Sequence, residues 1–578
     1  MTKLVTRQTV EVSMKSLIPL YICTFTLSGC FTVVATDKPE ALVEEGTRNT
    51  KPVLISQTIE ATKSKGTIIT LGDQKDADGD TVTYRVSQSN NYNTGPLENQ
   101  ITYQNDTIET ELLTVNATDG ITDEVSSSIM VNVTSASPSN FVSTRDIIFS
   151  SFGDTPPAKG ESRIDPTTGA KITRLTDVND LEGTDAALIV YSRYTPENTD
   201  GEYFLVFGYN STSSWVMNRK TGDIVNELKS HNSKTIGEAH EVRWDLSGNH
   251  PNRIYYRDGM GLYKIDDVTA TSPAPTLIKD FSTDIPNATK VYNDVEGDSS
   301  NDSDHWAFMA VHYDYDVKNF VIDAYVHYQI STDTVHTLKP SDLAGTNLDN
   351  EKDLLAFTRR PNMVEVSPLG TGIVIHMGGR GGAPHAGTWF DGAHLWPLDF
   401  DHTKQAPIKI SVSETHSGWA FDKDGREMFI SQNNANDKLD AIYVTGDNAG
   451  YDNRVIVTDH PDFGYSTNFH YGKMPENRKG WMFINTYTRS DHVNYDTSWG
   501  ADQLIMMEIK PKEENPIIWR ISPNYNRYTG QYRDEAPAAI NHLGNRIYVT
   551  ANWGDHSNSR EVYTIALPND WDDMANFE

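Results

Sequence analysis

Residues 237–264 have the sequence GEAHEVRWDLSGNHPNRIYYRDGMGLYK and contain a complete supersecondary unit. Glu241–Trp244 alternates polar and apolar residues, which is typical of a half-buried strand. Ser247–Asn252 is a turn by composition, and Arg253–Tyr256 returns with β-prone aromatic and branched residues. A second turn leads into Leu262–Ile265 as a third strand. Three strands joined by tight turns cannot bury both faces alone, so neighbouring copies are expected to cover them.

The same pattern recurs from Phe141 onward at a period of roughly forty to sixty residues, which is typical of propeller blades. Seven copies can be counted, and their second strands are expected at Tyr203–Phe207, Arg253–Tyr256, Trp306–Met309, Ile373–Ile375, Glu427–Ile430, Trp481–Ile484 and Arg546–Val549. No long run of helical periodicity interrupts them. The sequence therefore predicts an all-β chain with a seven-bladed β-propeller over residues 141–578.

The two ends of this repeat region indicate how the ring closes. Arg163–Gly169, running on to Ile172–Leu175, is similar to the outer-strand hairpin of the first full blade but has no inner strands before it. Glu561–Ile565 offers a third strand to the last blade. We therefore expect the earlier segment to complete the last blade, which leaves no long open edge.

The first fifty residues predict an export and anchoring signal. Leu17–Thr26 is apolar but too short to span a bilayer, and Leu27–Cys30 resembles a bacterial lipobox, in which the chain is cut before Cys30 and that cysteine is lipidated. The other cysteine, Cys23, lies in the removed segment. We expect a signal peptide at 1–30 and a linker at 31–50. The protein would be a bacterial outer-membrane or cell-surface lipoprotein whose lipid anchor is its membrane contact, or else an ordinary secreted protein.

Residues 51–138 predict a small separate module. Thr67–Leu71, Val82–Val86 and Ile129–Val133 alternate as sandwich strands do, which favours an immunoglobulin- or cadherin-like β-sandwich. Asp76–Asp80 and Ala117–Gly120 are acidic turns whose carboxylates could hold calcium. A solvated acidic turn without an ion is the alternative. The module is expected to act as a spacer.

Charge and motifs exclude several classes of function. The chain has 49 Lys and Arg against 80 Asp and Glu, a net charge of −31, and no basic patch, so nucleic acid is not an expected partner. It contains no Gly-x-Ser-x-Gly elbow and no His-Glu-x-x-His pattern. Paired carboxylates for glycoside hydrolysis stay open, because acids are plentiful throughout. We expect a monomer.

Propeller topology brings the residues before each first strand and those after each second strand to one face of the ring. His, Tyr and Arg are frequent at these positions, and the wider set includes His470, Arg533 and Tyr209. Each has a plainer alternative: a lone histidine is more often structural, and Arg243 beside Trp244 is more consistent with an interblade ion pair. The glycines of His376–His385 would let a backbone approach a ligand closely.

Residues of these types suit the removal of a weakly acidic proton beside a carboxylate, which uronate elimination requires. In this assortment and in its blade pattern the chain resembles propeller polysaccharide lyases, especially ulvan lyases and more distantly oligogalacturonate lyases. The resemblance implies β-elimination in a uronic-acid-containing anionic polysaccharide, with ulvan as the first choice. The histidine cluster of manganese-binding oligogalacturonate lyases is not evident in the sequence.

By analogy with ulvan lyases, His240, His312 or His416 would contact the substrate, Tyr313 would act as acid and base, and Arg360 or Arg380 would neutralise the carboxylate. Further substrate-binding candidates are Arg193, Arg243, His385, Tyr487, Arg489 and Trp553. The elimination requires no cofactor, although structural calcium or another divalent metal is open, at an unknown site. A non-catalytic glycan-binding propeller and a propeller glycoside hydrolase are the alternatives.

Overall fold

The computed structural model describes residues 50–572 with interruptions at 55–56, 63–66, 88–90, 95–97, 104–109, 123, 135–141, 147–154, 190, 210, 295, 317, 345–360, 378–387, 413, 465–466, 489–497, 529, 536, 555–558 and 568–570. The predicted signal peptide and the lipidation site Cys30 lie outside the described residues, as do Arg360, Arg380, His385 and Arg489. Within the described ranges, no helix is long and apolar enough to cross a membrane.

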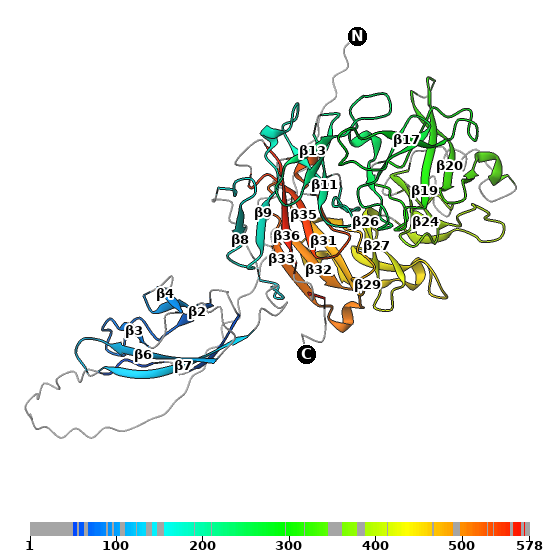
Figure 1. Ribbon diagram of the computed structural model, residues 1–578. Coiled ribbons are helices and arrows are strands. Elements are labelled where there is room, and N and C mark those ends of the chain that lie inside the picture. The colour runs from blue at the N-terminus through cyan, green and yellow to red at the C-terminus, as the bar shows by residue number, and fades with distance from the viewer. Residues whose placement is uncertain are drawn as a thin grey trace, which may run out of the picture.

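Residues 57–134 form two sheets that share one core, at the lower left of Figure 1. One sheet has the order β1 (Gln57–Thr62), β7 (Val125–Thr134), β6 (Thr110–Thr118), β3 (Thr83–Ser87), and the other has the order β2 (Thr67–Thr70), β5 (Gln100–Tyr103), β4 (Tyr92–Thr94). Tyr103, Leu113 and Ile129 meet between them with no exposed surface. In the turn at Asp76, one carboxylate oxygen accepts hydrogen bonds from the backbone N–H groups of Asp78 and Asp80, and calcium binding there stays a prediction.

From residue 162 onward the described strands build seven antiparallel sheets around a common axis. The first three are β10 (Ala187–Leu188), β11 (Tyr203–Gly208), β12 (Ser214–Asn218), β13 (Ile224–Glu227); β14 (Arg243–Trp244), β15 (Ile254–Asp258), β16 (Gly261–Ile265), β17 (Pro275–Asp280); and β18 (Lys290–Tyr292), β19 (His305–Asp314), β20 (Asn319–Gln329), β21 (Thr334–Leu338).

The next three are β22 (Met363–Val366), β23 (Ile373–His376), β24 (Ala393–Trp396), β25 (Ile408–Ser411); β26 (Glu414–Phe421), β27 (Glu427–Asn433), β28 (Lys438–Tyr443), β29 (Val455–Asp459); and β30 (Thr467–Tyr471), β31 (Trp481–Thr488), β32 (Gln503–Glu508), β33 (Ile518–Pro523). The last is β34 (Ala538–Ile540), β35 (Arg546–Ala551), β36 (Glu561–Ala566), β9 (Lys171–Arg174), β8 (Ser162–Ile164). Short 3₁₀ turns lie at Val178–Asp180, Glu238–His240, Pro340–Leu343, Tyr451–Asn453, His460–Phe463, Lys512–Glu514 and Tyr532–Asp534.

The ring closes through the segment that the sequence assigned to the last blade. β36 pairs with β9, which pairs with β8, so strands from both ends of this region share one sheet. Neighbouring sheets also share apolar cores all round the ring; for example, Tyr548 of the last sheet packs against Phe204 of the first. The predicted closure and the predicted all-β propeller fold are therefore confirmed.

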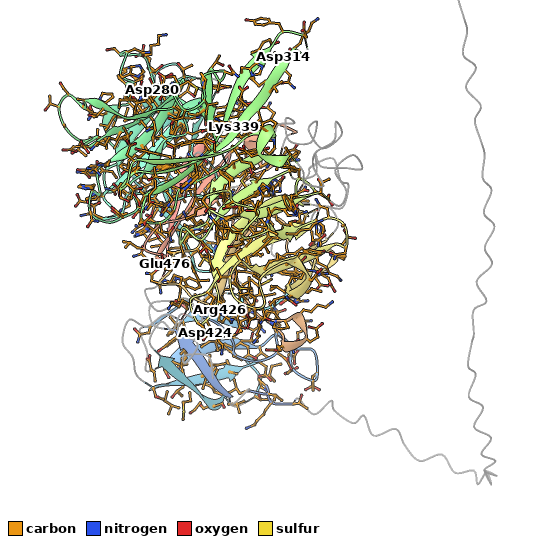
Figure 2. All side chains as sticks on the ribbon, turned by 90° about the vertical axis from the view of Figure 1, so that its right-hand side faces the viewer. Asp280, Asp314, Lys339, Asp424, Arg426 and Glu476 are labelled. Carbon is orange, nitrogen blue, oxygen red and sulfur yellow. The ribbon has the colours of Figure 1, made fainter. Side chains whose placement is uncertain are left out.

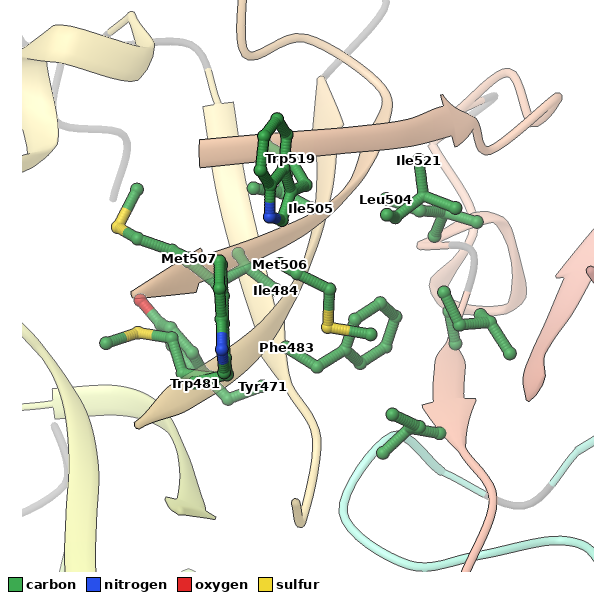
Figure 3. Packing of buried hydrophobic residues seen from close by; sticks show 14 of the residues in the cluster. Tyr471, Trp481, Phe483, Ile484, Leu504, Ile505, Met506, Met507, Trp519 and Ile521 are labelled. Carbon is green, nitrogen blue, oxygen red and sulfur yellow. The ribbon is translucent and has the colours of Figure 1, made fainter. Parts of the chain in front are cut away.

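The cores between sheets explain the apolar runs in the sequence. Trp481 to Ile484 in β31 are each at most 1% exposed, because both faces of this strand are covered by neighbouring sheets. Figure 3 shows Trp481, Phe483, Met506 and Trp519 interdigitating across β31, β32 and β33. Fully burying one such side chain stabilises the fold by about 1.5–3 kcal/mol.

The first strands are shorter than the sequence predicts. Only Arg243 and Trp244 of the predicted strand Glu241–Trp244 belong to β14, because Glu241 has a left-handed φ of 52° at the end of the Glu238–His240 turn. In the first sheet, the first strand β10 comprises only Ala187–Leu188, and Tyr191–Tyr194 lie after it in a turn. A first strand has a neighbouring strand on one side only. Its other side faces the channel, where its side chains can bond to residues of other blades.

Candidate functional site

One end of the central channel holds a cavity, which we call the mouth cavity. Its lining comes from the start of the first sheet, the end of β11, the turn before β14, β30 and the segment before β34, and consists of Leu188, Ile189, Tyr191, Tyr209, Glu238, His470, Arg533, Glu535 and Pro537. Its empty volume, including its open side, is ≈ 450 Å³. This is the face at which the sequence predicted a site.

His470, on β30, is the most enclosed polar residue of the mouth cavity, with 1% of its surface exposed. Its ring stacks on Tyr487 at 5.0 Å between centroids, meets Tyr191 edge-on at 5.2 Å and lies 4.6 Å from the ring of His416. Its Nε2 is 3.6 Å from Oε2 of Glu535. Neither ring nitrogen has a hydrogen-bond partner among the described residues, which is a costly state for a buried polar group.

His416, His470 and Glu535 together suit a divalent cation. One donor atom from each lies within 4.8 Å of the others, and imidazole nitrogen with carboxylate oxygen is a common donor set for such metals. One of the two unpartnered nitrogens of His470 would then bind the ion. The chain's residues therefore fit a metal ion at this place.

Burial favours the neutral form of two histidines near the channel axis, His376 and His416. Burial lowers the pKa of His416 well below its ordinary value, and the nearby His470, His376 and Arg193 lower it further. Burial also lowers the pKa of His376 to about 3, with a smaller effect from Arg193. A neutral imidazole can accept a proton or bind a metal, whereas an imidazolium can do neither.

Arg533 supplies a cation to the mouth cavity. Its Nη1 is 3.2 Å from Asp185, its guanidinium lies 5.0 Å above the ring of Tyr209, and its Nε has no hydrogen-bond partner in the described part of the chain. An arginine that keeps a free donor beside a cavity is suited to a carboxylate ligand.

Tyr191 connects the mouth cavity to the deeper channel. Its hydroxyl donates to the carboxylate of Glu296, which also accepts from Asn362 Nδ2 at 3.3 Å. Burial raises the pKa of Glu296 to about 7, despite the opposing attraction of Arg193. Tyr191 is therefore bonded to a carboxyl group that changes its protonation near neutral pH.

Below this level the channel contains a group of matched charges, which we call the channel ion cluster: Arg193, Arg243, Asp298, Glu365 and Lys473. Arg193 donates to Glu365, to Ser417 and, at 3.2 Å, to the carbonyl of Glu296. Burial nevertheless raises the pKa of Glu365. A second cavity, lined in part by Lys473, opens at the opposite end of the channel.

Arg243 and Lys473 share one carboxylate in this cluster. Arg243 Nε is 3.6 Å from Asp298, its Nη2 donates to Gly297 O at 2.6 Å and its guanidinium lies 3.6 Å above the ring of Tyr194. Lys473 Nζ is 2.9 Å from the other oxygen of Asp298. Arg243 thus has the interblade ion pair that was the plainer alternative, and substrate binding by Arg193 and Arg243 stays a prediction.

The other predicted catalytic residues are distributed over separate blades. His240 Nδ1 accepts from Gly237 N at 3.1 Å, and burial lowers its pKa. His312 Nδ1 is 2.9 Å from Asp323, and Tyr313, with 40% of its surface exposed, lies at the end of β19. None of these three belongs to the described lining of the mouth cavity.

The structure brings His416 and Tyr487 of the predicted set together, both against His470. Trp553 is instead in the core, 2% exposed, with Tyr525 stacked at 4.2 Å and Tyr563 at 5.0 Å. Sequence reasoning missed Tyr191, Glu296 and Glu535. It recognised His470 and Arg533 on this face by their position before or within a first strand but gave them no role.

Comparison with solved structures returns proteins of low identity. The chain is similar to the WD40 domain of Toxoplasma gondii coronin (TM-score 0.37, 9% identity, covering 67% of this chain and 84% of that one). It is also similar to Kuenenia stuttgartiensis hydrazine synthase (TM-score 0.37, 12% identity, 66% and 98%) and to the β-propeller domain of Myceliophteria thermophila Cps50 (TM-score 0.36, 10% identity, 66% and 98%). These likenesses carry no argument about activity. No protein-family model and no curated protein matches the chain, so the site itself carries the functional proposal.

Proposed function

We propose that the chain is a polysaccharide lyase that cleaves a uronic-acid-containing anionic polysaccharide, with ulvan as the first choice, by β-elimination in the mouth cavity. The observation that carries the proposal is the buried His470, whose nitrogens have no described partner, held between two tyrosines and next to Glu535. Secretion or a lipid anchor at the cell surface would give such an enzyme access to a polymer.

In the proposed reaction, a base removes the proton at C5 of the uronate, the C4–O bond breaks and a C4–C5 double bond forms. The leaving oxygen takes up a proton. Tyr191 would make both transfers; this role is supported by its position in the cavity lining and by the bond from its hydroxyl to Glu296, a carboxyl group with a pKa of about 7. Arg533 would pair with the uronate carboxylate and so stabilise the charge that develops as the proton leaves.

A divalent cation bound to His416, His470 and Glu535 would add positive charge near the same carboxylate. Metal binding can be measured without turnover. We expect about one Mn²⁺ or Zn²⁺ per chain after equilibration and dialysis, lost in His470→Phe and Glu535→Gln and kept in His231→Phe, a control on an exposed histidine. Equal metal content in all four proteins would exclude this site.

The activity test is incubation with ulvan, polygalacturonate and alginate while the ultraviolet absorbance of unsaturated uronate is followed. A rise that Tyr191→Phe abolishes supports elimination with Tyr191 as acid and base. Tyr209→Phe, in the same cavity lining, is the matched control and should retain turnover. If Tyr313→Phe abolishes turnover and Tyr191→Phe does not, the acid–base role belongs to Tyr313.

One observation favours a second candidate function, glycoside hydrolysis. Glu238 and Glu535 both line the mouth cavity, and partial enclosure raises the pKa of Glu238, as a general acid requires. New reducing ends without new ultraviolet absorbance would favour this alternative. Glycan binding without any cleavage would favour the non-catalytic propeller.

A further inference from the structure

The β19–β20 hairpin projects beyond its own sheet. These strands have 10 and 11 residues, more than the other described strands of the ring. β18 pairs with β19 only as far as Val311, and β21 pairs with β20 only from Tyr325 onward. The part between, residues 312–324, is therefore a two-stranded ribbon; Figure 2 shows Asp314 at the outer end of this strand pair.

The ribbon carries a cluster of exposed aromatic rings. Tyr313 and Tyr315 are 40% and 83% exposed, and their rings meet edge-on at 5.2 Å. Tyr313 also contacts the ring of Phe320 on the opposite strand at 5.4 Å, and Lys290 Nζ lies 3.8 Å above Phe320. Single exposed rings are common on protein surfaces, but grouped exposed rings commonly mark an interaction site.

The position of the ribbon relates it to the mouth cavity. β19 is the second strand of its sheet and ends at the face that holds the cavity, so the ribbon rises from that face of the ring. The cavity is small and open on one side, whereas a polysaccharide continues outside it. Each tyrosine offers an apolar face to a pyranose ring and a hydroxyl that can bond the sugar. Asp314 and Asp316 flank the rings, so ring stacking rather than general charge attraction would hold the ligand.

We propose that Tyr313, Tyr315 and Phe320 form a glycan-binding platform for the part of the polysaccharide that extends beyond the mouth cavity. The inference rests on the proposed function for the class of ligand. It gives Tyr313 a binding role in place of the acid–base role predicted from the sequence. The two roles separate experimentally, because stacking needs the ring of Tyr313 and proton transfer needs its hydroxyl.

The test is affinity electrophoresis of the full chain in gels containing ulvan, polygalacturonate or alginate, with a gel without glycan as reference. We expect the wild type to be retarded by at least one glycan and Tyr313→Ala/Tyr315→Ala to bind it about tenfold more weakly. Tyr313→Phe keeps the stacking ring and should therefore be retarded more strongly than Tyr313→Ala/Tyr315→Ala. Leu369→Ala, an exposed apolar residue in the turn between β22 and β23, is the matched control on the opposite face.

Several outcomes would overturn the platform. They are no retardation of the wild type in any of the three gels, equal retardation of the wild type and the double variant, and lost turnover in Tyr313→Phe with Tyr191→Phe active. Sedimentation that shows a wild-type dimer dissociated by the double substitution, with unchanged retardation, would make the ribbon a contact between copies. Retardation does not require cleavage, so the two proposals can fail separately. If the wild type cleaves none of the glycans but the double variant still loses binding, the lyase proposal is refuted and the platform proposal stands. Tyr315→Ala alone is a second variant, because removing the most exposed ring should not disturb folding.

Discussion

The channel ion cluster and the mouth cavity occupy successive levels of one channel and are built from the same kinds of residue. In the cluster, Arg193 reaches Glu365, and both Arg243 and Lys473 reach Asp298. In the cavity, the ring nitrogens of His470 have no hydrogen-bond partner among the described residues. The polar residues of both levels are buried, but those of the cluster have partners whereas the nitrogens of His470 do not.

This difference offers a criterion, besides position, for distinguishing structural from functional polar residues. Removing one member of a buried ion pair lowers stability strongly, because the charge of the other member is left uncompensated. A buried imidazole without a partner weakens the fold, so its retention requires another reason, such as a ligand. Arginines and histidines at equivalent strand ends thus have different roles, which their partners reveal and their sequence positions do not.

The largest expected effect is on stability, in the channel ion cluster. Arg193→Met leaves Glu365 buried without its cation, and we expect the free energy of unfolding to fall by about 3–5 kcal/mol. Urea denaturation followed by tryptophan fluorescence measures this.

Its companion variant adds Glu365→Gln, which removes the stranded charge but keeps an acceptor for Trp419 Nε1, now 3.0 Å from Glu365. We expect the double variant to recover most of the lost stability. A single substitution that costs less than about 1 kcal/mol would contradict the structural role of the cluster.

His470→Phe should lower activity rather than stability. Phenylalanine keeps the ring between Tyr191 and Tyr487 but removes both unpartnered nitrogens. We expect turnover to fall by at least about 100-fold, because the proposed metal site loses a ligand, a change at least as costly as losing an outer-shell partner. The urea midpoint should be unchanged or slightly higher. A large loss of stability with normal turnover would assign His470 to the structure instead.

The ring could be predicted from the sequence because its signal is local and repeated. Each copy carries its own alternating strands and turns, and the outer-strand hairpin before residue 175 is similar to another in the same chain. The ends of the first strands were predicted less well, because Glu241 adopts a left-handed conformation that its residue type does not announce.

The sequence predicted the residue types of the candidate site but only some of its residues. His416 and Tyr487 were chosen, whereas Glu296 and Glu535 were not, because one acid among eighty has no distinguishing local pattern. Their importance comes from partners on other blades: Glu296 bonds to Tyr191, more than 100 positions earlier in the chain. Such contacts depend on how neighbouring blades face each other, which no repeat period encodes.

Glu296 lies between the two levels, and its titration should be visible in stability. Its pKa rises from 4.5 to about 7 on folding, so between these values the folded chain keeps a proton that the unfolded chain has lost. The free energy of unfolding therefore contains a contribution that falls as pH rises through this window and is constant above it. In Glu296→Gln this contribution should disappear. The free energy of unfolding of the variant minus that of the wild type should therefore rise with pH across this window. A constant difference from pH 4.5 to 7 would show that the carboxyl group does not titrate as described.

The smallest effect is expected for an ion pair of similar length outside the channel. Lys404 Nζ is 2.6 Å from Asp401, closer than Lys473 is to Asp298, but the lysine side chain is 75% exposed. Water and salt screen such a pair, and ordering its long side chain offsets the attraction. Lys404→Met should therefore leave the urea midpoint unchanged, whereas Lys473→Met should lower it clearly. If both substitutions had the same effect, burial would not be what distinguishes the channel ion cluster from the surface.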